Sequence, residues 1–326
     1  MVEETRRGSA HGGGLKKDLL VAGPMHGATL KVLDDTYATH KLWLAPDRDA
    51  FLASLADRID AVATSGRYGM DDATMAKLPK LKLIAHFGVG VDSIDVDAVK
   101  RRGIALTNTP DVLTDDVADI AMGLLLATVR KIAAGDRYVR EGKWLKSGAM
   151  PLTDSIQGKT LGIVGLGRIG RAIAKRAEAF NLKIAYQGPR RKTDVPWPYF
   201  EDAVALARAA DFLVAACPGG EETRGLVSRA VLEALGPEGV VVNISRGSVI
   251  DEPAMVDLLK SGKLGGAGLD VFDKEPAVPD ELLAMDNVVL QPHVGSATHP
   301  TRRAMGQLVI DNLALYFAGK PLKTPY

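Results

Sequence analysis

Short apolar runs alternate with longer amphipathic stretches along the first third of the chain. Five of these apolar runs are candidate β-strands: residues 18–23 (DLLVAG), 40–45 (HKLWLA), 58–66 (RIDAVATSG), 80–90 (KLKLIAHFGVG) and 103–110 (GIALTNTP). Apolar runs separated in this way are typical of βαβ units, whose strands form a parallel sheet.

A second alternating series begins at Thr160 and contains six candidate strands: residues 160–165 (TLGIVG), 183–188 (KIAYQG), 211–217 (DFLVAAC), 239–245 (GVVVNIS), 265–272 (GGAGLDVF) and 287–296 (NVVLQPHVGS). Six parallel strands make a complete doubly wound sheet. The pattern therefore predicts an α/β protein with two Rossmann-like, doubly wound parallel-sheet domains.

Three helices are predicted around these strands in addition to the one that follows the glycine-rich turn described below. The segment from Asp115 to about Trp144 starts with acidic residues, and the absence of proline from its early part (DDVADIAMGLLLATVRKIAA) predicts a long helix there. Pro253 and Gly262 bound a second helix that starts after Asp251. The third, residues 301–319, is expected to pack against the first series of strands, which makes the N-terminal domain discontinuous.

The composition narrows the possible functions. A length of 326 residues favours two domains, and the 46% hydrophobic and 25% charged fractions are those of a globular protein. Because the net charge is only +1, no whole-chain field would attract nucleic acid or an anionic membrane. We expect neither nucleic acid nor a membrane as a partner.

The single cysteine, Cys217, cannot form an internal disulfide, and the chain has no cluster with zinc-ligand spacing. Residues 1–16 lack the apolar stretch of a secretion signal, and no later segment reaches the 18 apolar residues that cross a bilayer. We therefore expect a cytoplasmic protein without a metal, and we expect residues 1–16 to be a flexible tail.

A glycine-rich turn follows the first strand of the second series. Gly165, Gly167 and Gly170 form a G-x-G-x-x-G motif between an apolar strand and an amphipathic helix. In this context the three glycines permit a tight turn, close approach of a pyrophosphate and close packing of the helix on the strand. The alternative is a glycine turn that binds no ligand.

The next strand ends in residues that bear on the choice of dinucleotide. A site selective for NAD places Asp or Glu at this point to bind the ribose 2′-hydroxyl. Here Gln187 ends the strand and Arg190, Arg191 and Lys192 follow, with no acid between Glu178 and Asp194. Because cations attract a 2′-phosphate, the sequence favours NADP(H), and the alternative is a solvated basic loop.

Titratable residues follow three later strands of the same series. They are Arg246 in NISRG, Asp270 and Glu275 in GLDVFDKEP, and His293 in PHVGS. Ligands bind where parallel strands of such sheets end. An arginine to hold a carboxylate and a histidine paired with a carboxylate to supply a proton would suit the reduction of a 2-keto acid.

The chain resembles the D-isomer-specific 2-hydroxyacid dehydrogenases, through HFGVGVDSID, GLGRIG, NISRG, GLDVFDKEP and PHVGS in that order. Within that family it is most similar to the NADPH-dependent glyoxylate/hydroxypyruvate reductases and their hydroxyphenylpyruvate reductase relatives. The resemblance implies a substrate-binding domain at 17–112 and 296–326 and a NADP-binding domain at 113–295, with the active site in the cleft between them.

The resemblance also implies roles for individual residues. Arg246 would orient the substrate, Glu275 would pair with His293, the general acid and base, and the amides of Val89 and Gly90 would hold the substrate carboxylate. A homodimer would form on residues 115–155, with Trp144 either in the partner's substrate pocket or as an interface anchor. The expected cofactor contacts are Thr114, Gly165, Gly167, Arg168, Ile169, Gly170, Gln187, Arg190, Arg191, Cys217, Pro218, Thr223, Ile244, Ser245, Arg246, Asp270, His293 and Gly295.

The remaining histidines and Cys217 receive lesser roles. We expect Cys217 to be buried in the core or at the edge of the cofactor, His299 to lie on the surface, and Thr114 to cap the long helix as well. His86 could line the substrate cleft, whereas His26 and His40 have no partner that the sequence assigns, and His11 falls in the tail.

The sequence thus predicts NADPH-dependent reduction of glyoxylate or hydroxypyruvate to the D-2-hydroxy acid. Two alternatives stay open: a reductase for a larger 2-keto acid, 2-ketogluconate or hydroxyphenylpyruvate, and a corepressor-like protein that senses a dinucleotide without catalysis.

Overall fold

The computed structural model describes residues 16–326, so His11 and the expected tail lie outside the described residues except for Lys16. The chain folds as two compact units. The first contains residues 16–87, Ser93–Asn108 and Gly306–Tyr326, and the second contains Gly88–Asp92 and Thr109–Met305. The loop Gly88–Asp92, which the sequence pattern attached to the first domain, therefore belongs to the second unit.

The described part of the first unit contains a five-stranded parallel sheet in the order β2-β1-β3-β4-β5. Its strands are β1 (Asp18–Val21), β2 (Ala38–Lys41), β3 (Ala61–Ser65), β4 (Leu83–Phe87) and β5 (Ala105–Thr107). The strands β1, β3 and β4 are almost fully buried, as expected for a parallel sheet that is covered on both faces. This is the doubly wound arrangement that the alternating pattern predicted.

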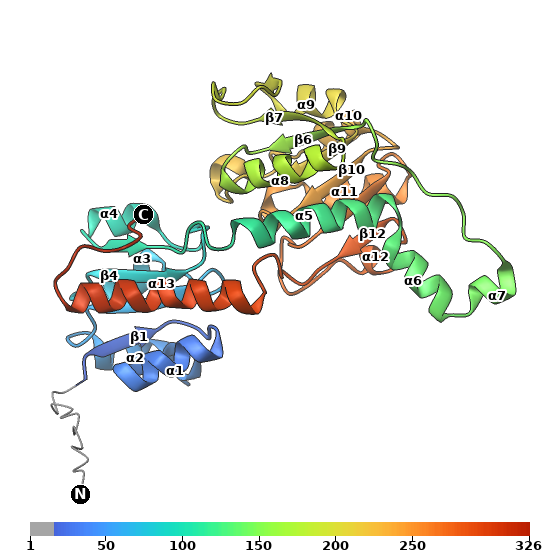
Figure 1. Ribbon diagram of the computed structural model, residues 1–326. Helices are drawn as coiled ribbons and strands as arrows, with labels where there is room; N and C mark the ends of the chain where they lie inside the picture. Colours follow the sequence, from blue (N-terminus) through green and yellow to red (C-terminus); the bar gives the residue numbers. More distant parts are fainter. Residues whose placement is uncertain (1–15) are drawn as a thin grey trace, which may run out of the picture. The chain divides into compact units, whose positions relative to one another are not determined.

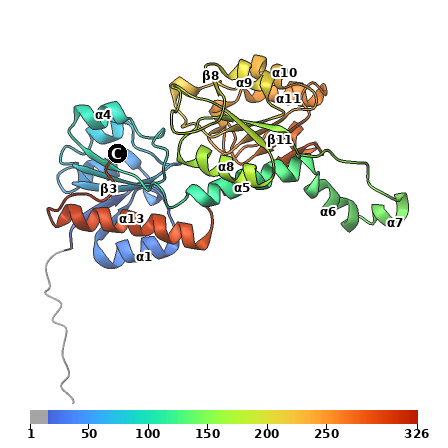
Figure 2. The ribbon, with the colours of Figure 1, turned by 45° about the horizontal axis from the view of Figure 1, so that its top comes forward.

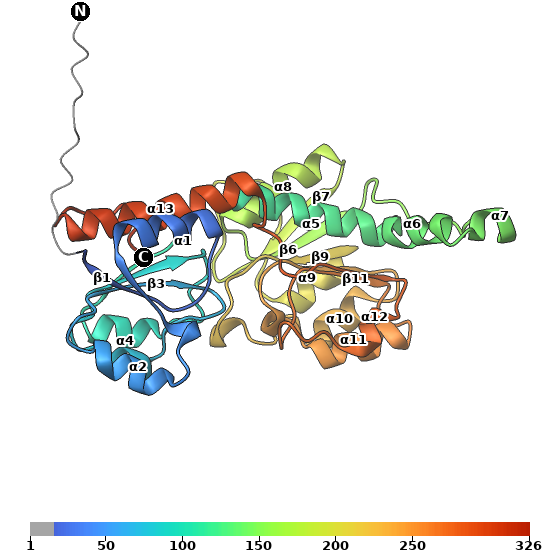
Figure 3. The same ribbon diagram turned by 90° about the horizontal axis from the view of Figure 1, so that it is seen from below.

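Helices cover both faces of this sheet. They are α1 (Gly27–Thr36), α2 (Arg48–Leu55), α3 (Asp72–Ala76), α4 (Val96–Arg101) and α13 (His299–Phe317), the last of which enters the unit at Gly306. Figure 3 shows α1 and α13 on one face and α2 and α4 on the other. The C-terminal helix packs on the N-terminal segment as expected, since the rings of Tyr37 and Phe317 lie 5.2 Å apart and α13 runs beside α1 (Figure 1).

The strand predicted at residues 40–45 is confirmed only at His40 and Lys41, the last two residues of β2. Strand β2 pairs with β1 from Asp18 opposite Ala38 to Val21 opposite Lys41, and β1 ends there. Residues Leu42–Leu44 have no strand left to pair with and form a short 3₁₀ helix, η1, in which the Ala45 amide donates to the Leu42 carbonyl. The apolar pattern of this segment reflects the burial of Leu42 and not a pairing strand.

The second unit contains a seven-stranded parallel sheet in the order β12-β11-β10-β9-β6-β7-β8 within its described residues. Its strands are β6 (Thr160–Val164), β7 (Lys183–Gln187), β8 (Tyr199–Phe200), β9 (Phe212–Ala215), β10 (Val240–Asn243), β11 (Gly266–Leu269) and β12 (Val288–Leu290). The first six in chain order stand in the 3-2-1-4-5-6 order of a dinucleotide-binding sheet. The predicted fold class is confirmed, but the predicted number of strands is not, because β8 pairs with the end of β7 and was missed.

Helices cover the two faces of the second sheet as well. They are α5 (Thr114–Val129), α8 (Arg168–Ala179), α9 (Ala203–Ala209), α10 (Arg229–Leu235), α11 (Glu252–Lys260) and α12 (Asp280–Leu283), with the 3₁₀ helices η2 (Glu221–Thr223) and η3 (Gly247–Val249). Figure 2 shows α5 and α8 on one face and α9, α10 and α11 on the other. The predicted start of α11 is confirmed, because the Asp251 side chain accepts from the Ala254 amide and Pro253 lies in the first turn.

The predicted long helix is interrupted, which the sequence pattern did not reveal. Helix α5 ends at Val129, Lys131 adopts a left-handed conformation, and two further helices follow, α6 (Ile132–Arg140) and α7 (Lys143–Ser147). Half of α5 is buried, whereas no residue of α6 or α7 is buried in this chain. Figure 2 shows α6 and α7 extending past the helices that cover the sheet.

Candidate active site

The glycine-rich turn joins β6 to α8 and has the geometry of an anion site. Gly165 has φ +98°, and a Cβ atom there would lie 2.6 Å from the Cys217 Cα. A Cβ at Gly170 would collide with the Gly165 carbonyl, whereas nothing lies within 4 Å of the Cβ position at Gly167. Helix α8 begins at Arg168 without a side-chain cap, so its first amides can bind a phosphate. The turn therefore fits a dinucleotide.

The other expected cofactor residues lie mostly where strands of this sheet end. They are Gln187 at the end of β7, Cys217 and Pro218 after β9, Ile244 and Ser245 after β10, Asp270 after β11, and Gly295 after β12. The Thr223 hydroxyl donates to the Pro218 carbonyl at 2.7 Å, which fixes the loop after β9. Since all these strands are parallel, the residues share one edge of the sheet.

Three further expected contacts, besides Gly170 and Thr223, lie on helices of the same unit. Ile169 follows Arg168 in the first turn of α8, and the Arg168 guanidinium forms an ion pair with Asp111 at 2.8 Å. The predicted cap at Thr114 is wrong: Thr114 is the first residue of α5, and Leu113 occupies the capping position without a side-chain hydrogen bond. The acidic pair that follows Thr114 supplies the favourable charge instead.

The basic loop after β7 is held by its own strand. The Tyr186 hydroxyl accepts from the Lys192 amide at 2.7 Å and donates to the Lys192 carbonyl at 3.3 Å. Arg171 is paired with Asp194 at 2.9 Å, whereas neither Arg190 nor Arg191 forms an ion pair with any described residue. Both arginines are exposed and available to an anionic ligand.

Glu275 and His293, predicted as a pair, are in contact. The Nδ1 atom of His293 lies 2.8 Å from Oε2 of Glu275, and Oε1 of Glu275 accepts from the Phe272 amide at 3.2 Å. Burial opposes ionisation of Glu275, but the hydrogen bond and charge of His293, with help from the Phe272 amide and Arg246, outweigh it and lower the pKa of this carboxyl. Glu275 is therefore the anionic partner of the imidazole.

Asp270 fixes the turn that carries His293. Its carboxylate accepts from the amides of Val294 at 2.7 Å and Gly295 at 2.8 Å, and its carbonyl accepts from the His293 amide at 2.8 Å. These bonds hold His293 in a left-handed conformation with φ +55°. Burial raises the pKa of Asp270, and the two amides partly offset that effect. The expected contact between Asp270 and a nicotinamide stays a prediction.

Arg246 lies against the loop that contains Val89 and Gly90. Its Nε donates to both carboxylate oxygens of Asp92, at 3.1 and 3.0 Å, and its Nη1 donates to the Ser245 carbonyl at 2.8 Å. A Cβ at Gly90 would lie 3.2 Å from Cζ of Arg246 and closer still to Nη2. The structure therefore brings Arg246 and Gly90 together, as the expected substrate contacts require.

Sequence reasoning missed three residues around Arg246. Asp92 was not assigned, although it belongs to the same motif as Gly90. A Cβ at Gly219 would lie 2.5 Å from Cγ of Arg246, and a Cβ at Gly247 would collide with the backbone between Phe272 and Asp273. These glycines allow the loops after β9, β10 and β11 to approach one another. The glycines in the loops after β9 and β10 were the signal available in the sequence.

The remaining candidates have different outcomes. Trp144 on α7 is exposed in this chain, and His299 is exposed at the start of α13, as expected for the latter. Cys217 is in the core, where burial raises the pKa of its thiol, so the prediction of a packing role is confirmed. His40 has a partner that the sequence did not reveal, because its Nε2 lies 2.6 Å from Asp18. His86 is buried in β4, and His26 precedes α1.

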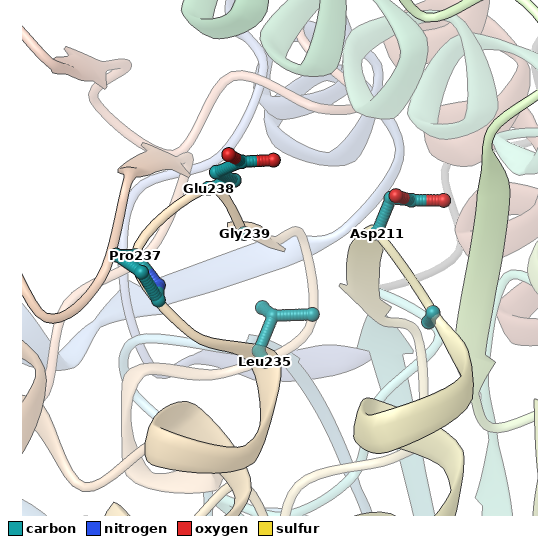
Figure 4. A pocket seen from close by; sticks show the side chains of 6 residues that line it. Asp211, Leu235, Pro237, Glu238 and Gly239 are labelled. Carbon is teal, nitrogen blue, oxygen red and sulfur yellow. The ribbon is translucent and has the colours of Figure 1, made fainter.

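A cavity of about 260 Å³ lies at the opposite edge of the second sheet (Figure 4). Asp211 and Gly239, two of the residues that line it, directly precede β9 and β10. The Asp211 carboxylate already accepts from the Thr160 amide at 2.8 Å and pairs with Lys159 at 3.1 Å. This cavity therefore lies at the amino ends of the strands, whereas the candidate site lies at their carboxyl ends.

No group of three or more potential ligands among His, Cys, Asp and Glu in residues 16–326 is arranged to hold a metal ion. No helix in the same range combines the length and the apolar composition that a bilayer-crossing helix requires.

Comparison with known proteins gives one consistent family. Residues 122–295 match the model of the D-isomer specific 2-hydroxyacid dehydrogenase NAD binding domain. The chain is 47% identical over 307 residues to hydroxyphenylpyruvate reductase of Plectranthus scutellarioides and to glyoxylate/hydroxypyruvate reductase A of Arabidopsis thaliana, covering 94% of this chain and 98% of each relative. A Sinorhizobium meliloti NADPH-dependent glyoxylate/hydroxypyruvate reductase, solved with NADP and malonate, matches with TM-score 0.88 and 41% identity over 95% of this chain and 97% of that one.

Proposed function

The chain belongs to the D-isomer-specific 2-hydroxyacid dehydrogenase family, and we propose that it reduces glyoxylate or hydroxypyruvate to the D-2-hydroxy acid with NADPH. The observation that carries this proposal is the pairing of His293 with Glu275 on the same edge of the sheet as Arg246 and the glycine turn. The reductase relatives support the substrate class.

The chain's residues divide the polar chemistry of a carbonyl reduction among them. NADPH, when bound, supplies the hydride to the carbonyl carbon. Glu275 accepts a hydrogen bond from the protonated Nδ1 of His293. The transferable proton of His293 is therefore the one on Nε2, which the imidazole donates to the carbonyl oxygen. The Nη2 of Arg246, beside the Gly90 backbone, would bind the substrate carboxylate. A proton from solvent then restores the imidazolium, which the Glu275 carboxylate stabilises.

The preference for NADPH is proposed from the loop after β7. Arg190 and Arg191 are exposed cations without ion pairs among the described residues, and no acid ends the strand to repel a 2′-phosphate. The NADP complex of the Sinorhizobium relative supports the same choice. Replacing both arginines by alanine should raise the KM for NADPH about tenfold or more and leave the KM for NADH nearly unchanged. An unchanged ratio of the two constants would contradict this assignment.

A homodimer is proposed from the exposed apolar side chains of the segment from α6 to residue 155. Ile132, Val139, Trp144, Leu145 and Leu152 are exposed, and Leu145 and Leu152 expose 92% and 97% of their surface. Such a surface favours contact with a second copy. Trp144 would serve either as an anchor or as a contact to the partner's substrate. Light scattering on the wild type and on a Leu145→Glu, Leu152→Glu variant tests the dimer.

We also propose a cytoplasmic location, consistent with a single buried cysteine.

The alternative substrate is a larger 2-keto acid, which the hydroxyphenylpyruvate reductase relative supports at the same identity as the glyoxylate/hydroxypyruvate relative. Steady-state turnover with glyoxylate, hydroxypyruvate, 4-hydroxyphenylpyruvate and 2-ketogluconate, each with NADPH and with NADH, tests the proposal. The highest kcat/KM should belong to one of the two small acids with NADPH. No turnover with any pair would favour a nucleotide sensor instead.

A further inference from the structure

We propose that Asp92 is a positioning residue for Arg246, and that it decides which edge of the guanidinium is offered to the substrate carboxylate. This inference rests on the proposed function, because it assumes that Arg246 binds that carboxylate.

The contact between the two side chains is well defined. The Nε of Arg246 donates to both oxygens of Asp92, and the two residues are 154 positions apart in the sequence. The Asp92 side chain is only 23% exposed and the Arg246 side chain 29%, so water screens their attraction less than at an open surface. The Ser245 carbonyl accepts from Nη1. Two of the three guanidinium nitrogens are therefore held by the protein, and Nη2 remains beside Gly90.

This arrangement restricts how an anion can bind Arg246. A guanidinium can present either the edge that contains Nε or its outer edge, Nη1 and Nη2, to a carboxylate. Asp92 occupies Nε, so the outer edge is the one that remains for the substrate. Without Asp92 the Ser245 carbonyl alone of these two partners would hold the side chain, and Gly90 and Gly219 place no Cβ atoms that would restrict its rotation.

The sign of the effect separates positioning from simple electrostatics. Asp92 carries a negative charge near the place where a negative substrate would bind, so its Coulomb effect alone opposes binding. If that effect dominated, replacing Asp92 by asparagine would lower the KM for the keto acid. If positioning dominates, the same replacement raises the KM, because Arg246 no longer meets the carboxylate in one orientation.

The test compares Asp92→Asn, Asp92→Glu and a control, Asp97→Asn, whose carboxylate is 83% exposed and lies 4.0 Å from Lys100. For each variant we would measure the KM and kcat for the preferred keto acid, the Kd for NADPH and the inhibition constant of oxamate. Asp92→Asn should raise the KM and the oxamate constant about tenfold, with a smaller change in kcat and none in the NADPH Kd. Asp92→Glu should recover part of the loss, and Asp97→Asn should match the wild type.

A double-mutant cycle tests whether Asp92 acts through Arg246. In an Arg246→Ala background, the exchange Asp92→Asn should change the oxamate constant less than about twofold, since the group it positions is gone. An equal effect in both backgrounds, or a KM that is unchanged or lowered in the single variant, would overturn the inference. If Asp92→Asn does not fold, Asp92→Ser replaces it in the cycle. A wild type without turnover on any keto acid would instead overturn the proposed function.

Discussion

Replacing Gly90 by alanine should remove most of the activity without unfolding the protein. A Cβ at this position would lie 2.8 Å from Oδ1 of Asp92 and 3.2 Å from Cζ of Arg246, with Nη2 closer still. Ordinary van der Waals contacts are about 3.5 to 4.0 Å, so the guanidinium has to move by roughly 1 Å. Its far end is flexible, and the movement therefore costs little stability. A misplacement of about 1 Å in a substrate-positioning group can cost about 100-fold in rate, or about 2.7 kcal/mol.

The assay compares kcat/KM for the preferred keto acid, the NADPH Kd and the melting temperature. Gly90→Ala should lose about 100-fold in kcat/KM and leave the other two quantities nearly unchanged. Gly27→Ala is the matched control, because nothing lies within 4 Å of its Cβ position and its φ is not positive. Wild-type activity in Gly90→Ala would refute the placement of Arg246 against this loop.

Three further predictions concern the same group of loops. Gly247→Ala should lower the melting temperature strongly, since its Cβ would collide with the backbone of Phe272 and Asp273, and a folded variant of wild-type stability in a thermal melt would contradict the close approach. Asp270→Asn should cost about 1 to 3 kcal/mol in unfolding free energy and lower kcat, because its amide NH₂ would face one of the two backbone amides that now donate to the carboxylate. Urea titration measures the first effect and steady-state kinetics the second. The pKa of Glu275 is lowered in the folded state, so wild type should be more stable than Glu275→Gln above about pH 4.5. This difference in stability should shrink as the pH falls further. A difference in melting temperature that stays constant with pH would contradict the ion pair.

The hydrophobic pattern was clearest for strands whose residues are buried over their whole length. Strands such as β4 and β10 are continuous apolar runs bounded by turn residues, and burial on both faces of a parallel sheet is what produces that pattern. Strand β8 was missed because it has two residues at the sheet edge and is only partly buried. The break after α5 was missed because Arg130 and Lys131 are not helix-breaking residue types, and the left-handed turn forms where burial ends.

The candidate site was predictable where chemistry follows a strand. Glu275 and His293 stand after neighbouring strands, so the pattern of the sheet is enough to place them at one edge, and their contact at 2.8 Å agrees with that placement. The contact between Asp92 and Arg246 could not be predicted, because it joins two loops 154 residues apart and no periodicity connects them. The same limit applies to Asp270, whose carboxylate proved to bind backbone amides.

The central claim, that this chain passes a hydride from NADPH to a small 2-keto acid with His293 as the proton donor, is tested most directly by isotope transfer. NADPH deuterated at the transferred position is incubated with hydroxypyruvate and either wild type or His293→Ala, and the glycerate is analysed by mass spectrometry and chiral chromatography. Wild type should yield D-glycerate with one deuterium on C2, and His293→Ala should yield almost none. Unlabelled or L-configured product from wild type, or an equal yield from His293→Ala, would contradict the account.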